Sequence, residues 1–197
     1  MDEPAPRLFI AVPLPPDILA SCRAVIDEVV AGPAGTVPRW VELSGLHVTL
    51  RFLGPTRPAD LPAVRAAVAA AAEGHVAFPI ELAGAGAFPN AARPRALWLG
   101  IAQGADELGA LVRSLDEPLA TVGFPRETRP FRPHLTVART DAASHADGQA
   151  AAWALEEAAR EWTATFIAER VTLFRSHLGR GPAKYEPLLQ VSLPARA

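Results

Sequence analysis

Hydrophobic residues recur along this chain with two periods, a helical one of about 3.6 residues and a strand-like one of two. The first helical segment carries the apolar stripe Ile18, Leu19, Cys22, Val25, Ile26 and Val29. The predicted helices are Pro16–Val30, Asp60–Glu73, Ala105–Val122 and Asp147–Glu161. The predicted strands are Leu46–Leu53, Val76–Phe88, Arg95–Ala102, Pro133–Arg139, those near Thr163–His177, and Tyr185–Leu193.

These elements follow one another in a repeated order. A strand, a helix and two strands succeed each other twice, and a helix precedes each copy. An internal repeat of this kind predicts two similar lobes related by pseudo-symmetry. We therefore expect an α+β fold in a single domain, residues 1–197, with two β-sheet lobes centred on 46–102 and 133–193. Outer helices would cover the sheets, and a central cleft would lie between them.

A short polar pattern stands in the first strand of each copy: His47-Val48-Thr49-Leu50 and His134-Leu135-Thr136-Val137. Side chains alternate across a strand, so histidine and threonine two residues apart share one face. The aliphatic residues between them turn to the other face and can be buried in a core. Each strand thus presents an imidazole and a hydroxyl side by side.

One such pattern alone is usually a half-buried histidine beside a strand threonine. The repetition in matching context is what indicates function here. Two facing strands would supply two proton-transfer groups and two hydroxyl donors around a small anion. Those groups suit the transfer of a phosphate ester without a metal.

The cations of this chain are 18 arginines and one lysine, with a net charge of −2. That charge disfavours long non-specific tracking along nucleic acid. Arginines nevertheless cluster around the second pattern: Arg126, Arg129, Arg132 and Arg139. Strict alternation puts Arg132 on the face of His134 and Arg139 on the opposite face unless the strand ends or bulges. A solvated rim is one interpretation; the planar fork of arginine, which matches phosphate oxygens, favours a binding role for at least one of them.

Other features narrow the class of protein. Cys22 is the only cysteine, so no disulfide can form within the chain, as is typical of a reducing cytosol. No leader and no membrane-length apolar run is present, and we expect a cytoplasmic protein without a membrane partner. No metal-ligand spacing or phosphate-cradling glycine loop occurs, which predicts no metal and no other cofactor.

At these residues the sequence resembles a known family, and the resemblance extends over nearly the whole chain. The matching segments are Arg7–Ala11, Trp40-Val41, Leu46–Gly54, Gly86–Pro89, Pro94–Gly100, Arg129–Arg139 and Leu173–Ser176. They resemble the two-histidine (2H) phosphoesterases, specifically the RNA 2′,3′-cyclic phosphodiesterases also called bacterial 2′-5′ RNA ligases. Val48 stands where the family often has leucine, and a buried strand position accepts either residue.

The resemblance implies a bilobal 2H-phosphoesterase fold and a metal-independent activity. The enzyme would open 2′,3′-cyclic phosphates at RNA ends to 2′-phosphomonoesters, and by joining a 5′-hydroxyl end to the cyclic phosphate it would reversibly form a 2′-5′ linkage. His47 would be the proton donor and His134 the proton acceptor. Thr49 and Thr136 would bind the phosphate with Arg139, which the family pattern favours over Arg132.

The implied partners are RNA ends or nucleotides with a 2′,3′-cyclic phosphate, tRNA fragments among them, and we expect a monomer. Two alternatives stay open. One is a phosphodiesterase for small cyclic or 2′-5′-linked nucleotides. The other is a nucleotide- or RNA-binding module without turnover, which the intact histidines and threonines disfavour.

Overall fold

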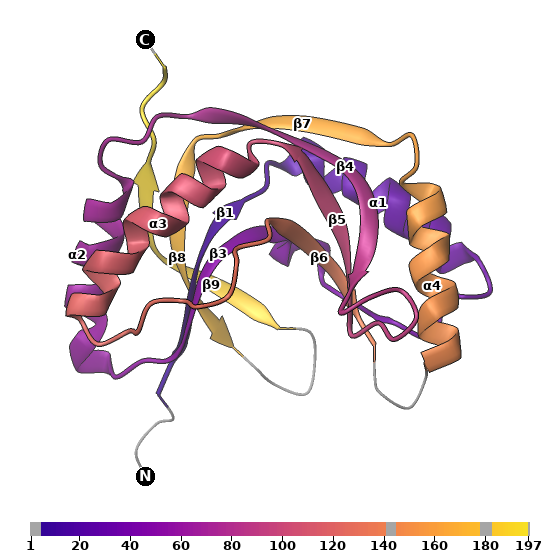
Figure 1. The fold of residues 1–197 in the computed structure, drawn as a ribbon, viewed down its shortest axis with the longest axis horizontal. Coiled ribbons are helices and arrows are strands. Elements are labelled where there is room, and N and C mark those ends of the chain that lie inside the picture. The colour runs from indigo at the N-terminus through magenta and orange to yellow at the C-terminus, as the bar shows by residue number, and fades with distance from the viewer. Residues whose placement is uncertain (1–4, 141–144, 178–182, 197) are drawn as a thin grey trace.

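The computed structural model describes residues 5–140, 145–177 and 183–196, folded into two curled antiparallel sheets between two pairs of helices (Figure 1). The first sheet has the strand order β3-β1-β8-β9, with bounds His47–Pro55, Arg7–Pro13, Arg170–His177 and Lys184–Ser192. The second sheet has the order β2-β6-β5-β4-β7, with bounds Arg39–Trp40, His134–Arg139, Ala96–Gln103, Phe78–Phe88 and Thr163–Ala168. The predicted α+β class with two sheets and outer helices is confirmed.

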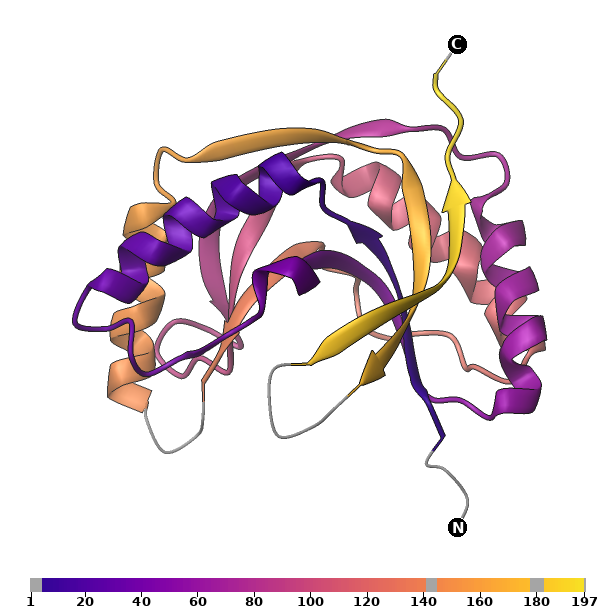
Figure 2. The ribbon, with the colours of Figure 1, turned by 180° about the vertical axis from the view of Figure 1, so that it is seen from behind.

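Each helix pair covers one sheet. Helices α2 (Leu61–Ala72) and α3 (Ala105–Thr121) pack together against the first sheet. Helices α1 (Pro16–Ala31) and α4 (His145–Ala158) pack together against the second, and the view from behind shows α1 alongside α4 (Figure 2). Each end of these four helices lies within three residues of the predicted end. None of the helices in the described residues is long and apolar enough to cross a membrane.

The helix α1 shows why these segments form where they do. Proline at the first turn has a backbone angle that suits a helix and lacks an N–H that would go unpaired there. The predicted stripe is buried: Ile18, Cys22, Val25, Ile26 and Val29. Burial also raises the pKa of the Cys22 thiol to about 12, so this cysteine is an inert core residue.

The assignment of one lobe to 46–102 and the other to 133–193 is wrong. Strand β3 pairs with β1, which pairs with β8, whereas β4 and β5 of the first repeat join β6 and β7 in the second sheet. The predicted strand region Thr163–His177 breaks at Glu169, and its halves belong to different sheets. Each β-α-β-β unit contributes strands to both sheets. The internal symmetry therefore relates two units that are interleaved, and not two separate lobes.

Candidate active site

The two motif strands, β3 and β6, contact each other where the sheets meet. His47, Thr49, His134 and Thr136 are all half-buried, while Val48 and Leu135 beneath them are completely buried. Burying such a side chain contributes about 1.5–3 kcal/mol, so the core anchors each strand under its polar face. The predicted alternation of polar and buried side chains is confirmed in this part of both strands.

One cavity of about 340 Å³ brings four of the six predicted site residues together. His47, Thr49, Thr136 and Arg139 all line it. His134 lies at the edge of an adjoining groove whose wall also includes Thr49. The two imidazoles are close enough for a charge on one to lower the pKa of the other. We call the 340 Å³ space the phosphate cavity, since its two hydroxyls and one guanidinium are donors suited to an anion.

A shift of register explains how Arg139 reaches this cavity. In β6, Thr136 pairs with Trp98 and Ala138 pairs with Leu97, so Val137 is one residue too many for its partner strand. Such a bulge reverses the alternation, and Val137 and Ala138 are both buried. Arg139 therefore returns to the face of His134 and Thr136. Among the described residues it has no ion-pair partner, which leaves its guanidinium available to a ligand.

The same shift occurs in β3 and identifies a residue that sequence reasoning missed. Thr49 pairs with Ala11 and Arg51 with Ile10, so Leu50 is the extra residue. Phe52, five residues after His47 as Arg139 is five after His134, then turns towards the cavity. Phe52 is 68% exposed and lines both the phosphate cavity and the adjoining groove. The equal spacing from the two histidines was the signal in the sequence.

Two further arginines near the motifs, Arg51 and Arg132, have different surroundings. Arg51 is only 7% exposed and donates to Asp116 Oδ1 at 3.1 Å and to the Pro125 carbonyl, which ties β3 to α3 and the segment after it. Arg132 is exposed and lines the adjoining groove. It is not among the residues that line the phosphate cavity.

A backbone carbonyl two residues before each histidine orients its ring. His47 Nδ1 lies 2.6 Å from the Gly45 oxygen, and His134 Nδ1 lies 2.7 Å from the Arg132 oxygen. A carbonyl only accepts hydrogen bonds, so Nδ1 carries the proton in both rings and donates it. Nε2 is then the atom that each histidine offers to a substrate.

Aromatic rings pack tightly around His47. Phe9 lies with its ring centroid 4.6 Å from that of His47, and Tyr185 approaches edge-on at 5.2 Å. A Cβ atom on Gly45 would lie 2.8 Å from Tyr185 Cε2, so only glycine permits this packing beside the histidine. On the other strand, Phe88 contacts His134 edge-on at 4.9 Å.

This packing changes the proton affinity of both histidines. Burial lowers the pKa of His47 from 6.5 to about 4, although the hydrogen bond to the Gly45 carbonyl opposes the shift. Burial also lowers the pKa of His134, and the charge of Arg139 acts in the same direction. Both imidazoles are thus neutral at about pH 7 in the free protein.

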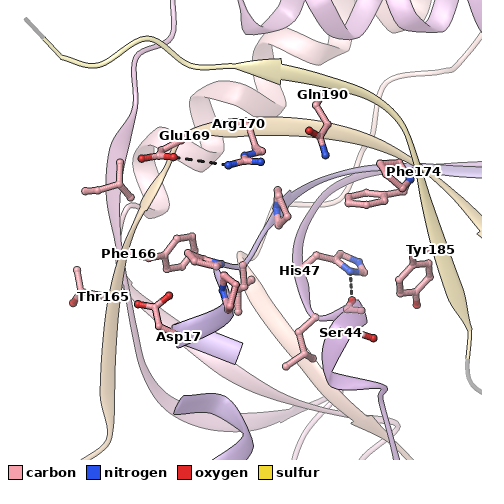
Figure 3. Close-up of a pocket in the computed structure, with 18 residues that line it drawn as sticks. Asp17, Ser44, His47, Thr165, Phe166, Glu169, Arg170, Phe174, Tyr185 and Gln190 are labelled. Atoms are coloured by element: carbon pink, nitrogen blue, oxygen red, sulfur yellow. Dashed lines mark hydrogen bonds and ion pairs between the residues drawn. The ribbon is translucent and has the colours of Figure 1, made fainter. Parts of the chain in front are cut away.

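A second cavity, of about 540 Å³, lies on the other side of His47, between the start of α1, strands β7 and β8, and Tyr185 (Figure 3). Its charged residues are Asp17, Glu169 and Arg170, and the last two form an ion pair with 3.9 Å between Nη2 and Oε2. With two carboxylates and its one arginine already paired, this cavity suits an anion less well than the phosphate cavity does. In the part of the chain that the structure describes, no three histidine, cysteine or acidic side chains gather as metal ligands.

The fold is that of the two-histidine phosphoesterases. Residues 15–180 match the sequence profile of the 2′-5′ RNA ligase superfamily, and the chain belongs to that family. A crystal structure of TT0787 from Thermus thermophilus has a TM-score of 0.75 and 26% identity, covering 97% of this chain and 100% of the other. Another, of E. coli LigT complexed with 3′-AMP, has a TM-score of 0.72 and 26% identity, covering 97% and 99%.

Curated relatives carry the name RNA 2′,3′-cyclic phosphodiesterase. The one from Geobacillus stearothermophilus is 32% identical over 91% of this chain, and the chain spans only 55% of that relative's length. The one from Escherichia coli K12 is 30% identical over 98% of this chain and 99% of its own length.

Proposed function

We propose that this protein hydrolyses 2′,3′-cyclic phosphates at RNA ends to 2′-phosphomonoesters, without a metal. The observation that carries the proposal is that two His-x-Thr strands face one another, with Arg139 brought beside their threonines in one cavity. The names of the curated relatives and the family match support the same activity.

The proposed roles follow from in-line displacement at phosphorus. Nucleophile and leaving group lie on opposite sides, so an acid and a base must flank the phosphate. His47 Nε2 protonates the leaving O3′, and His134 Nε2 takes the proton from the attacking water. The family pattern supports the assignment of His47 as the acid and His134 as the base. The chemistry alone would allow either histidine to take either role.

The donors of the phosphate cavity hold the anion between the histidines. Thr49 and Thr136 donate hydrogen bonds to non-bridging oxygens, and Arg139 offsets the charge that grows on them in the transition state. The exposed ring of Phe52 offers a stacking surface for the terminal base. The anion also raises the proton affinity of His47, which favours the protonated form that the acid role needs.

We further propose that the same groups act with an RNA 5′-hydroxyl in place of water: its oxygen attacks the cyclic phosphate and gives its proton to His134. The bond to O3′ then breaks, O3′ takes its proton from His47, and a 2′-5′ linkage forms. The family name supports this second activity. We also propose that the protein is a single-domain monomer in the cytoplasm. Its substrates there would be RNA ends such as those of tRNA fragments. The family resemblance and the single buried thiol support that setting.

The test is an oligonucleotide that ends in a 2′,3′-cyclic phosphate, incubated with the purified protein and EDTA. Phosphorus NMR of the product distinguishes a 2′-phosphate, the expected result, from a 3′-phosphate, which would reverse the substrate orientation. Turnover of the mononucleotide alone would favour the alternative of a small-nucleotide phosphodiesterase. Binding of both without turnover, by a protein folded according to circular dichroism, would indicate a binding module instead.

A further inference from the structure

A groove of about 710 Å³ continues from the phosphate cavity along α3. Its walls are the end of the β3 motif (49–52), one face of α3 (105–116) and the segment 127–134, which connects α3 to β6 (Figure 1). Thr49 and Phe52 line both spaces, and His134 lies at the junction. We call this space the α3 groove. A ligand whose terminal phosphate occupies the cavity therefore has the α3 groove directly beside it, at Thr49 and Phe52.

The charges along the α3 groove are arranged for an anion. Four arginines and three carboxylates line it. Asp116 is bound by Arg51 at 3.1 Å, and Glu127 lies 3.6 Å from Arg129. Of the three carboxylates only Asp106, in the first turn of α3, has no such arginine partner among the described residues.

Two arginines of the groove remain without an ion-pair partner in the described part of the chain, Arg113 and Arg132. Arg113 lies one helical turn after Gly109, and a Cβ atom on that glycine would be 3.2 Å from Arg113 Nη1. The absence of a side chain at Gly109 thus leaves room for the guanidinium of Arg113 beside it on the groove wall. Arg132 is exposed on the opposite wall, two residues before His134.

The cavity on the other side of His47 offers the contrast. It holds Asp17 and the ion pair of Glu169 with Arg170, so it repels a phosphate more than it attracts one. Of the two spaces that adjoin the catalytic residues, only the α3 groove combines free guanidinium groups with room for more than a single nucleoside.

We propose that the α3 groove is a subsite for RNA beyond the terminal nucleotide, in which Arg113 and Arg132 bind a backbone phosphate. The inference rests on the proposed function and makes it narrower, because it assigns a polynucleotide as the substrate and not a mononucleotide. The phosphodiester belongs either to the chain upstream of the cyclic end or to a second chain that brings a 5′-hydroxyl.

Binding of product-ended RNA tests the subsite independently of turnover. Fluorescence anisotropy would give the Kd of a labelled tetranucleotide that ends in a 2′-phosphate, and competition would give the Kd of the 2′-mononucleotide. We expect the tetranucleotide to bind more tightly. Replacing Arg113 by Gln should reduce the ratio of the two affinities by about 10- to 100-fold, the range expected for the loss of one hydrogen bond to a charged group. It should also reduce the salt dependence of tetranucleotide binding by about 0.7 in the logarithmic slope, for one lost phosphate contact.

Two further variants control the result. Arg113→Lys keeps the charge and should retain the salt slope. Arg23→Gln removes an exposed arginine from α1, outside the α3 groove, and should leave the affinity ratio as it is. In a second arm, a 5′-hydroxyl RNA without a terminal phosphate is titrated in the presence of the 2′-mononucleotide. An effect of Arg113→Gln in the first arm assigns the upstream chain to the groove, and an effect in the second arm alone assigns the second chain.

The subsite would be overturned if the tetranucleotide bound no more tightly than the mononucleotide in the first arm and the 5′-hydroxyl RNA did not bind in the second. A preference for RNA that survives the double change Arg113→Gln with Arg132→Gln would overturn it as well. A protein that binds RNA through these arginines but does not open the cyclic phosphate would keep the subsite and refute the proposed function, so the two failures are distinguishable.

Discussion

The half-buried histidine of the first motif allows a quantitative prediction about the stability of the protein. The pKa of His47 is lowered from 6.5 to about 4 by burial among aromatic rings. An unfolded chain takes up this proton near pH 6.5, whereas the folded protein takes it up only near the lowered value. Between the two values the unfolded state holds more protons, so acidification favours unfolding.

The size of the effect follows from the same two values. Between about pH 7.5 and about pH 4.5, the linkage relation gives a loss of about 2.5 kcal/mol in the free energy of unfolding from this one group. Other groups titrate over the same range, so the variant His47→Gln is the reference. Glutamine does not titrate, and its amide can still donate to the Gly45 carbonyl.

Urea denaturation of both proteins at the two pH values measures the difference. The wild-type protein should lose about 2.5 kcal/mol more than His47→Gln on acidification. Equal losses in the two proteins would show that His47 is protonated in the folded state at the acid pH. That result would refute the reasoning that this ring is buried and neutral.

Three further predictions concern activity on a cyclic-phosphate oligonucleotide, and a fourth concerns the binding of a mononucleotide. Replacing His47 or His134 by Ala should cost about 10²–10⁴-fold in turnover, and the double variant should lose less than the product of the two, because both act in one step; near-full activity of either variant would contradict the mechanism. Turnover should persist in EDTA, and kcat/KM should be highest below pH 6.5, because burial lowers the pKa of both histidines; loss on chelation with recovery by a divalent ion would contradict it. Arg139→Lys should slow turnover through loss of the planar fork, and Arg139→Ala should do more harm than Arg132→Ala, as initial rates would show. Phe52→Ala should weaken binding of the terminal nucleoside by about 1–3 kcal/mol, measurable as a raised Kd for the 2′-mononucleotide; an unchanged Kd would remove the stacking role.

The motifs and helices of this protein are predictable from local sequence, because they depend on periodicity. Val48 and Leu135 alternate with their histidines as the strand period requires, and both are fully buried. The pairing of strands is not local. Nothing in residues 78–103 specifies that they join His134 in one sheet while His47 lies in the other.

The position of Arg139 shows the same limit on a smaller scale. Strict alternation places it away from His134, and the extra residue Val137 in the pairing with β5 reverses that result. A bulge depends on the partner strand, so the sequence of β6 alone does not reveal it. The exposure of Phe52 was not predicted for the same reason, because it follows from the matching register shift at Leu50.

The exchange of strands between the repeats also determines when the first sheet can be completed during synthesis. Strand β1 can pair with β3 once both are translated, but the partner of its other edge, β8, is translated much later. Until then the nascent chain exposes an unpaired, strongly apolar edge, Leu8–Val12 in sequence, of the kind that recruits other chains. Pairings between strands far apart in sequence slow folding. The chain between the two strands loses conformational entropy when its ends come together, and only the contacts that form afterwards compensate that loss. A chain that ends before β8 therefore has His47 in a sheet in which one edge of β1 is unpaired, and such an edge promotes aggregation.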